Sequence, residues 1–197
     1  GLMRVRAFTQ DDAHIFCTQE QIGQEVKGFI DMLVDAYSVF GFEDLRFALS
    51  LRPEKRIGAD ELWDEAEEIL ENLLSEFDIE YDRMSGEGAF YGPKIDIFAP
   101  DALGREWQLG TVQLDFNQPD RFDLEYVAED GSRKRPAMIH RAMLGSIERF
   151  LGVWIEHTGG AFPLWITPVQ AIVIPITDRI NEYGASVVDK LMAAGLR

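Results

Sequence analysis

The stretch MIHRAMLGSIERF, residues 138–150, constrains the fold of this chain most, because it predicts a strand that passes directly into a helix. Gly145 and Ser146 open the helix, and the apolar residues then recur at the spacing of a helix packed on a core: Ile147, Phe150, Leu151, Trp154 and Ile155. Arg149 lies outside this stripe, in the first turn, where free N–H groups and the helix dipole favour a phosphate. The alternative is an ordinary surface arginine beside a buried helix.

Composition limits the class of protein. A chain of 197 residues with 46% hydrophobic residues predicts a globular protein of one domain, or of one domain and part of another. The single cysteine excludes an internal disulfide and fits a reducing compartment. The sequence has no apolar run of transmembrane length and no signal-peptide core, so we expect a cytoplasmic protein without a membrane partner. The formal charge of −16 disfavours non-specific nucleic-acid binding but leaves room for a local basic site.

Polar, charged and aromatic side chains recur at every second position from residue 4 to residue 14. In extended backbone one side would carry two cations, a ring, an amide, a carboxylate and an imidazole, which belong to Arg4, Arg6, Phe8, Gln10, Asp12 and His14. Such a set suits a polar ligand better than a core. A solvated face of an antiparallel sheet is the alternative interpretation.

Two amphipathic helices follow. Thr18 and Gln21 form a capping box for a helix that ends near Gly41, and residues 44–51 predict a strand. The second helix covers residues 59–77, with an inward stripe of Leu62, Ala66, Ile69, Leu70, Leu73 and Phe77. Residues 60–82 contain no lysine or arginine, and we interpret this acidic run as a solvated face.

The middle of the chain is rich in strand signals. Residues 86–98 and 105–116 predict a hairpin, and Asp130 with Gly131 predicts a tight turn. Gln108 and Gln113 have opposite parity along one predicted strand. If both side chains serve one pocket, the strand must contain a bulge near Gly110.

The end of the chain suggests a second domain. Residues 157–168 are rich in Gly, Pro and aromatic residues and predict a linker. Residues 169–176 have the β-branched character of a buried parallel strand, and Thr177 or Asp178 would cap a last helix that ends near Gly195. Because one strand and one helix cannot form a domain, we expect the chain to begin inside one domain and stop inside another.

Four blocks in this order, GLMRVRAFTQDDAHIFC, GEGAFYGPKIDIF, WQLGTVQLDF and MIHRAMLGSIERF, resemble the catalytic domain of the threonyl-tRNA synthetases, a family of class II aminoacyl-tRNA synthetases. The first block is similar to the second half of motif 2, and the last to motif 3. The resemblance implies an α+β fold, with a mixed, mainly antiparallel sheet flanked by helices over residues 1–164. Residues 165–197 would then be the first βα unit of an α/β anticodon-binding domain.

This family condenses threonine with ATP to threonyl-adenylate and passes the threonyl group to tRNA(Thr). On the amino-acid side, the resemblance implies that Asp12 accepts a hydrogen bond from the threonine hydroxyl. Gln10, Tyr91 and Gln113 would orient the carboxylate and the amino group, and Ser146 would line the pocket.

On the nucleotide side, Phe8 would stack on adenine, while Gln108 and Thr111 would lie near the ribose. Arg4 and Arg149 would hold the phosphates and act as the catalytic residues, with Mg²⁺ accompanying ATP. The attacking group is the carboxylate of the substrate itself, so catalysis consists mainly of positioning and charge neutralisation.

The resemblance also implies a zinc ion held by His14 and His140 and a homodimeric enzyme. Neutral imidazole is a good zinc ligand, and a zinc site with three protein ligands keeps open positions for substrate. Valine lacks the threonine hydroxyl and would leave polar partners in the site unmet. The family's third zinc ligand is a cysteine upstream of this chain, and Cys17 has the wrong strand parity to replace it.

Motif 1, the first strand of motif 2, the editing domain and most of the anticodon-binding domain also have no counterpart here. We therefore expect this polypeptide alone to be inactive in threonine activation. Two alternatives remain open from the sequence. One is a zinc hydrolase that uses His14, His140 and Asp12, and the other is a non-catalytic paralogue that serves as a binding or regulatory module.

Overall fold

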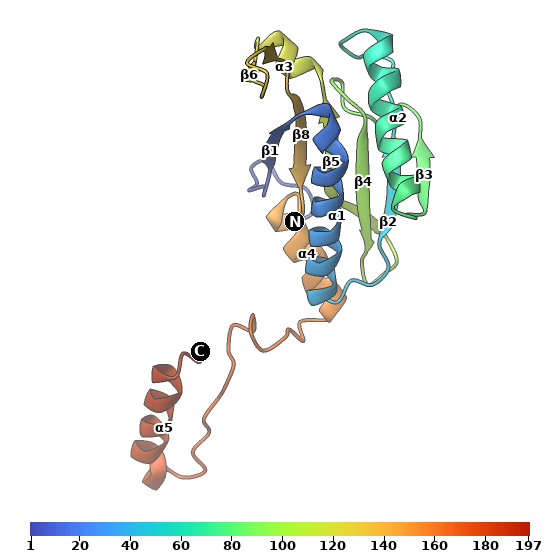
Figure 1. The fold of residues 1–197 in the computed structure, drawn as a ribbon. Helices are drawn as coiled ribbons and strands as arrows, with labels where there is room; N and C mark the ends of the chain where they lie inside the picture. Colours follow the sequence, from blue (N-terminus) through green and yellow to red (C-terminus); the bar gives the residue numbers. More distant parts are fainter. The chain divides into compact units, whose positions relative to one another are not determined.

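The computed structural model describes all 197 residues, and they form two compact units, Gly1–His157 and Thr158–Arg197. The first unit contains a six-stranded sheet in the order β1-β8-β5-β4-β2-β3, drawn as arrows in Figure 1. Its strands are β1 (Ala13–Cys17), β2 (Arg46–Ser50), β3 (Tyr81–Met84), β4 (Lys94–Pro100), β5 (Glu106–Asp115) and β8 (Ala137–Ala142). All neighbouring strands are antiparallel except β2 and β3, which confirms the predicted mixed, mainly antiparallel sheet.

The remaining elements connect these strands. The first unit contains the helices α1 (Ile22–Val39), α2 (Asp60–Glu76), α3 (Asn117–Arg121) and α4 (Ile147–Thr158), and a small hairpin of β6 (Tyr126–Val127) and β7 (Arg133–Lys134). The capping box of Thr18 and Gln21 is present, as predicted, before the short 3-10 helix η1 (Gln19–Gln21) leads into α1. None of the helices combines the length and apolar character that a membrane span requires.

Helices α1 and α2 lie over the sheet in Figure 1 and bury its apolar face. The large apolar strand residues that are fully buried include Leu49, Ile95, Ile97, Val112, Leu114 and Ile139. Helix α2 buries Trp63, Ala66, Leu70, Leu73 and Leu74. The predicted stripe was therefore partly wrong: Leu62, Ile69 and Phe77 are only half-buried, because the buried face of the helix is turned toward Trp63 and Leu74.

Helix α4 packs through a narrower stripe than its sequence predicts. Phe150 and Trp154 are buried and form edge-to-face ring contacts with Phe40 at the end of α1, with centroids 4.9 and 5.4 Å apart. Leu151 and Ile155, which were expected in the stripe, are 38% and 43% exposed. Gly152 and Val153 are also buried, so the buried face of α4 is centred on residues 150–154.

The predicted bulge in β5 is present. Ile97 pairs with Gly110 and Phe98 pairs with Gln108, so Leu109 is the extra residue of the strand. The insertion turns Leu109 and Val112 both toward the core, where they are 3% and 0% exposed.

Two predicted strands are not formed. Strand β1 begins only at Ala13, and before it Gln10 makes a single bridge to Ser146, because the backbone of this segment bonds to the turn before α4 rather than to a neighbouring strand. In the second unit, residues 169–176 are not a strand, whereas helix α5 (Asn181–Ala193) forms after a 3-10 turn η2 (Asp178–Ile180). A strand needs a hydrogen-bonded neighbour, and this segment has none in its own unit.

Two glycines are expected to respond oppositely to alanine. A Cβ at Gly92 would lie 1.9 Å from the carbonyl oxygen of Leu114, so Gly92→Ala should lower the free energy of unfolding by more than about 2 kcal/mol. Gly28 is exposed in α1 with no atom near its missing Cβ, and Gly28→Ala should raise stability by roughly 0.5–1 kcal/mol. Urea unfolding of both variants measures the difference, and equal effects would contradict it.

Cys17 is expected to behave as a core thiol. Burial, and secondarily the charge of Glu25, raises the pKa of Cys17 from 9.0 to about 11. This shift lowers its thiolate fraction at pH 8 by roughly a hundredfold, so a disulfide reagent should react far more slowly with the folded protein than with urea-unfolded protein. Since the folded pKa lies above the unfolded value, the stabilisation is complete below pH 9 and is lost as the pH rises toward 11. Equal reaction rates would show that the thiol is accessible.

Candidate active site

An open pocket of about 360 Å³ lies on the polar face of the sheet, opposite the face that α1 and α2 cover. Its walls come from the segment before β1, from β5 and from the turn between β8 and α4. The predicted site residues that line this pocket are Arg4, Phe8, Gln10, Gln108, Thr111, Gln113, Ser146 and Arg149. The structure therefore brings together residues that lie more than 140 positions apart in the sequence.

The β5 bulge makes this pocket possible. Because Leu109 is inserted, Gln108 faces the same side of the sheet as Thr111 and Gln113. Without the extra residue, Gln108 would point toward the core with Leu114 and Val112.

The other four predicted residues form a cluster beside the pocket. They are Asp12, His14, Tyr91 and His140. The Tyr91 hydroxyl donates a hydrogen bond to Oε1 of Gln113, and the Tyr91 ring lies 4.9 Å from the ring of His140. His14 and His140 face each other across β1 and β8, with ring centroids 4.6 Å apart. Burial, followed by the negative charges of Asp115 and Asp12, raises the pKa of Tyr91 to about 12, so its hydroxyl remains a donor at neutral pH.

Asp115 orients His140 and was missed by sequence reasoning. Its Oδ2 lies 2.9 Å from Nε2 of His140, and its side chain is fully buried. Its Oδ1 accepts the N–H groups of Asn117 and Gln118 at the start of α3. A carboxylate only accepts hydrogen bonds, so Nε2 carries the hydrogen, and in the neutral imidazole Nδ1 keeps a lone pair. The sequence contained one sign of this role: Asp115 stands two residues after Gln113, so both side chains face the same side of β5.

The histidine pair consists of side chains that commonly bind metal ions. His14 and His140 place two imidazoles together, and the carboxylate behind His140 matches the usual support of a metal-bound histidine. No group of three His, Cys, Asp or Glu side chains in these 197 residues is arranged to hold a metal ion.

Arg149 is held firmly at the other end of the pocket. Its Nε donates to the carbonyl of Met3 at 3.0 Å and its Nη1 to the carbonyl of Gln108 at 3.3 Å, while its guanidinium lies 5.8 Å from the centre of the Trp107 ring. Arg4 lines the same pocket. Two guanidinium groups therefore define a local cationic site within a strongly acidic chain.

Two carboxylates that the sequence did not single out fasten the pocket walls to each other. Asp11 accepts the N–H groups of Met143, Leu144 and Gly145 at 2.7, 3.0 and 3.0 Å. In the reverse direction, Glu148 accepts the N–H of Thr9 at 3.0 and 3.1 Å. We call this pair, Asp11 and Glu148, the carboxylate clasp.

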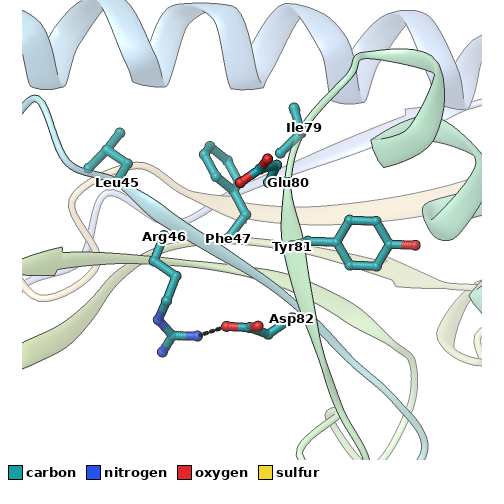
Figure 2. A pocket seen from close by; sticks show the side chains of 7 residues that line it. All are labelled: Leu45, Arg46, Phe47, Ile79, Glu80, Tyr81 and Asp82. Carbon is teal, nitrogen blue, oxygen red and sulfur yellow. Dashed lines mark hydrogen bonds and ion pairs between the residues drawn. The ribbon is translucent and has the colours of Figure 1, made fainter.

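A second, larger pocket of about 540 Å³ lies beside β2 and β3 (Figure 2). None of the predicted site residues lines it. Its cation, Arg46, is bonded to Asp82 and Glu106 at 2.9 and 2.8 Å and stacks on the Phe98 ring at 4.2 Å. Because these contacts occupy the guanidinium within the fold, we do not consider this pocket a candidate for catalysis.

Comparison with known proteins agrees with this geometry. The sequence model described as the tRNA synthetase class II core domain (G, H, P, S and T) matches residues 1–158. Threonine–tRNA ligases from Alkalilimnicola ehrlichii and Methylococcus capsulatus are 57% and 55% identical over all 197 residues, which span 31% of the length of each relative.

Among solved structures, the RNA binding domain of threonyl-tRNA synthetase from Cryptosporidium parvum superposes with a TM-score of 0.95 at 48% identity, covering 100% of this chain and 49% of that one. The class II core model matches most of the chain. The mainly antiparallel sheet and the residues on its polar face agree with that match. The chain belongs to the class II aminoacyl-tRNA synthetase core-domain family, within which it is highly similar to part of the threonyl-tRNA synthetases.

Proposed function

We propose that the intact protein containing this chain activates threonine with ATP and transfers the threonyl group to tRNA(Thr). The observation that carries this proposal is the division of one polar pocket into two ends: Arg4 and Arg149 lie at one end, and Gln113 links the other end to Tyr91 and His140. The high identity of the chain to threonine–tRNA ligases supports the same reaction. Homodimerisation and a cytoplasmic location remain predictions.

At the amino-acid end, Asp12 would accept the hydrogen bond of the threonine hydroxyl. Gln10 and Gln113 would orient the substrate carboxylate and amino group, and Ser146 would line the wall beside them. The Tyr91 hydroxyl restrains the amide of Gln113, so its orientation is set before the substrate binds.

At the nucleotide end, Phe8 would stack on adenine, Gln108 and Thr111 would contact the ribose, and Arg4 and Arg149 would hold the phosphates. The threonine carboxylate attacks the α-phosphorus of ATP, a new O–P bond forms, and the bond to the bridging oxygen of the β-phosphate breaks to release pyrophosphate. The two guanidinium groups neutralise the charge that develops on the phosphate oxygens. Mg²⁺ would accompany ATP, as it does in most nucleotide reactions.

We also propose that His14 and His140 are two ligands of a zinc ion that distinguishes threonine from valine through the substrate hydroxyl. The free Nδ1 of His140 and its support by Asp115 fit this role. Asp115 would then keep the imidazole in the orientation that the metal requires.

Loss of Arg149 should abolish most activation. In the full-length protein, Arg149→Ala is expected to lower kcat/KM for threonine-dependent ATP–pyrophosphate exchange by about a hundredfold or more, because one of the two cations that this chain would place on the phosphates is removed. Arg133→Ala is the matched control, since Arg133 is 73% exposed and pairs only with Glu125 at the surface. Similar losses in both variants would argue against the assigned role.

Zinc content gives an independent test of the histidine pair. His14→Ala and His140→Ala in the full-length protein should each remove bound zinc, measured by plasma mass spectrometry, and Asp115→Asn should weaken zinc binding by roughly 10–100-fold. The control is His157→Ala, because this third histidine stacks on Phe42 and contacts the carbonyl of Gly41. Retention of a full equivalent of zinc by the His14 and His140 variants would refute the assignment.

A further inference from the structure

Asp96 in β4 is a buried carboxylate directly beneath the candidate pocket. Only 2% of the residue is exposed, and its side chain receives four polar contacts. Oδ2 accepts a hydrogen bond from the Ser50 hydroxyl and pairs with the Lys94 ammonium, both at 2.7 Å. Oδ1 accepts hydrogen bonds from Nε2 of Gln108 at 2.6 Å and from the hydroxyl of Thr111 at 3.2 Å.

The two oxygens of Asp96 therefore have different neighbours. Oδ2 is occupied by residues outside the pocket lining, whereas Oδ1 is occupied by two residues that line the pocket. This division means that Asp96 acts on the pocket through one oxygen only, and that the other oxygen anchors the carboxylate within the sheet.

An ionised carboxylate accepts hydrogen bonds and donates none, so it determines which way its partners point. The amide of Gln108 must direct Nε2 toward Asp96, which leaves its Oε1 as the atom available to a ligand. The hydroxyl hydrogen of Thr111 is likewise directed toward Asp96, which leaves lone pairs on its Oγ1. Oε1 of Gln108 and Oγ1 of Thr111 are thus the acceptor oxygens that these two side chains can offer to a ligand.

The same polarity continues along β5. Nε2 of Gln113 lies 3.4 Å from Oγ1 of Thr111 and donates toward it, while Oε1 of Gln113 accepts from the Tyr91 hydroxyl. The side chains of Gln108, Thr111 and Gln113 therefore each have a defined hydrogen-bond direction, and the Asp96 carboxylate sets the first of these directions.

We propose that Asp96 is a positioning residue that makes Gln108 and Thr111 present acceptor oxygens to the ribose hydroxyls of ATP. A ligand that meets these oxygens must bring donors, and the ribose diol brings two. The inference rests on the proposed function, because it assumes that the nucleotide occupies this end of the pocket. It adds the reason why the ribose, rather than a deoxyribose, is the matching sugar.

The test measures sugar discrimination in the full-length protein. Threonine-dependent ATP–pyrophosphate exchange is followed with ATP, 2′-deoxy-ATP and 3′-deoxy-ATP for the wild type, Asp96→Asn and Ser50→Ala. The wild type should prefer ATP over at least one deoxy analogue by roughly tenfold or more in kcat/KM. In Asp96→Asn the asparagine amide can donate, the Gln108 amide is free to turn, and the preference should fall to within about twofold.

Ser50→Ala is the matched control. It removes a buried hydrogen bond to the same carboxylate, on the oxygen that faces away from Gln108. Its sugar preference and its KM for threonine should remain those of the wild type even if the protein is less stable. Equal loss of preference in Ser50→Ala would overturn the proposal, because general loosening of the sheet would then explain the effect.

A second variant covers the case in which Asp96→Asn does not fold, as judged by circular dichroism. Gln108→Met keeps the Asp96 carboxylate and the side-chain length but removes the acceptor, and it should reduce the sugar preference to a similar extent. Unchanged preference in a folded Asp96→Asn or in Gln108→Met, or no preference in an active wild type, would overturn the inference. A wild type without threonine-dependent exchange would instead refute the proposed function.

Discussion

The single inserted residue in β5 is the constraint on which the rest of the site depends. A strand alternates its side chains strictly between two faces, so a pocket wall and a core cannot both be continuous along β5 unless the alternation is interrupted. Leu109 provides the interruption beside Gly110, which has no Cβ and lies under Leu33 of α1. The core therefore keeps Leu109 and Val112 while the pocket keeps Gln108 and Thr111.

The two faces of the sheet also separate the charges of the protein. The solvated sides of α1 and α2 carry much of the acidic excess, on the side of the sheet away from the pocket. On the opposite face, Arg4 and Arg149 line one pocket, and the guanidinium of Arg149 is held by backbone carbonyls rather than by carboxylates. A chain with a formal charge of −16 thus retains a cationic end in its pocket, because no acidic side chain neutralises Arg149.

Local patterns predicted local structure well. The capping box at Thr18, the two amphipathic helices and the bulge near Gly110 follow from rules about neighbouring residues, and the structure confirms them. Features that depend on distant partners could not be predicted in this way. Asp11 and Asp96 look like ordinary acidic residues in the sequence, and their roles arise from donors that lie in distant segments of the chain. The apolar residues 169–176 likewise had the composition of a strand but lack a neighbour in their unit.

The carboxylate clasp has a consequence for how the protein is made. Thr9 and Glu148 are separated by 139 residues, and the contacts of Asp11 with the turn before α4 span nearly as many. Contacts of such long range form only after the intervening sheet has brought their ends together, since the chain entropy lost in closing the loop must first be offset by packing. During synthesis, the pocket wall formed by the segment before β1 can be fixed in place only after α4 has left the ribosome. A nascent chain that ends before α4 therefore has no complete substrate pocket, however much of its sheet has already formed.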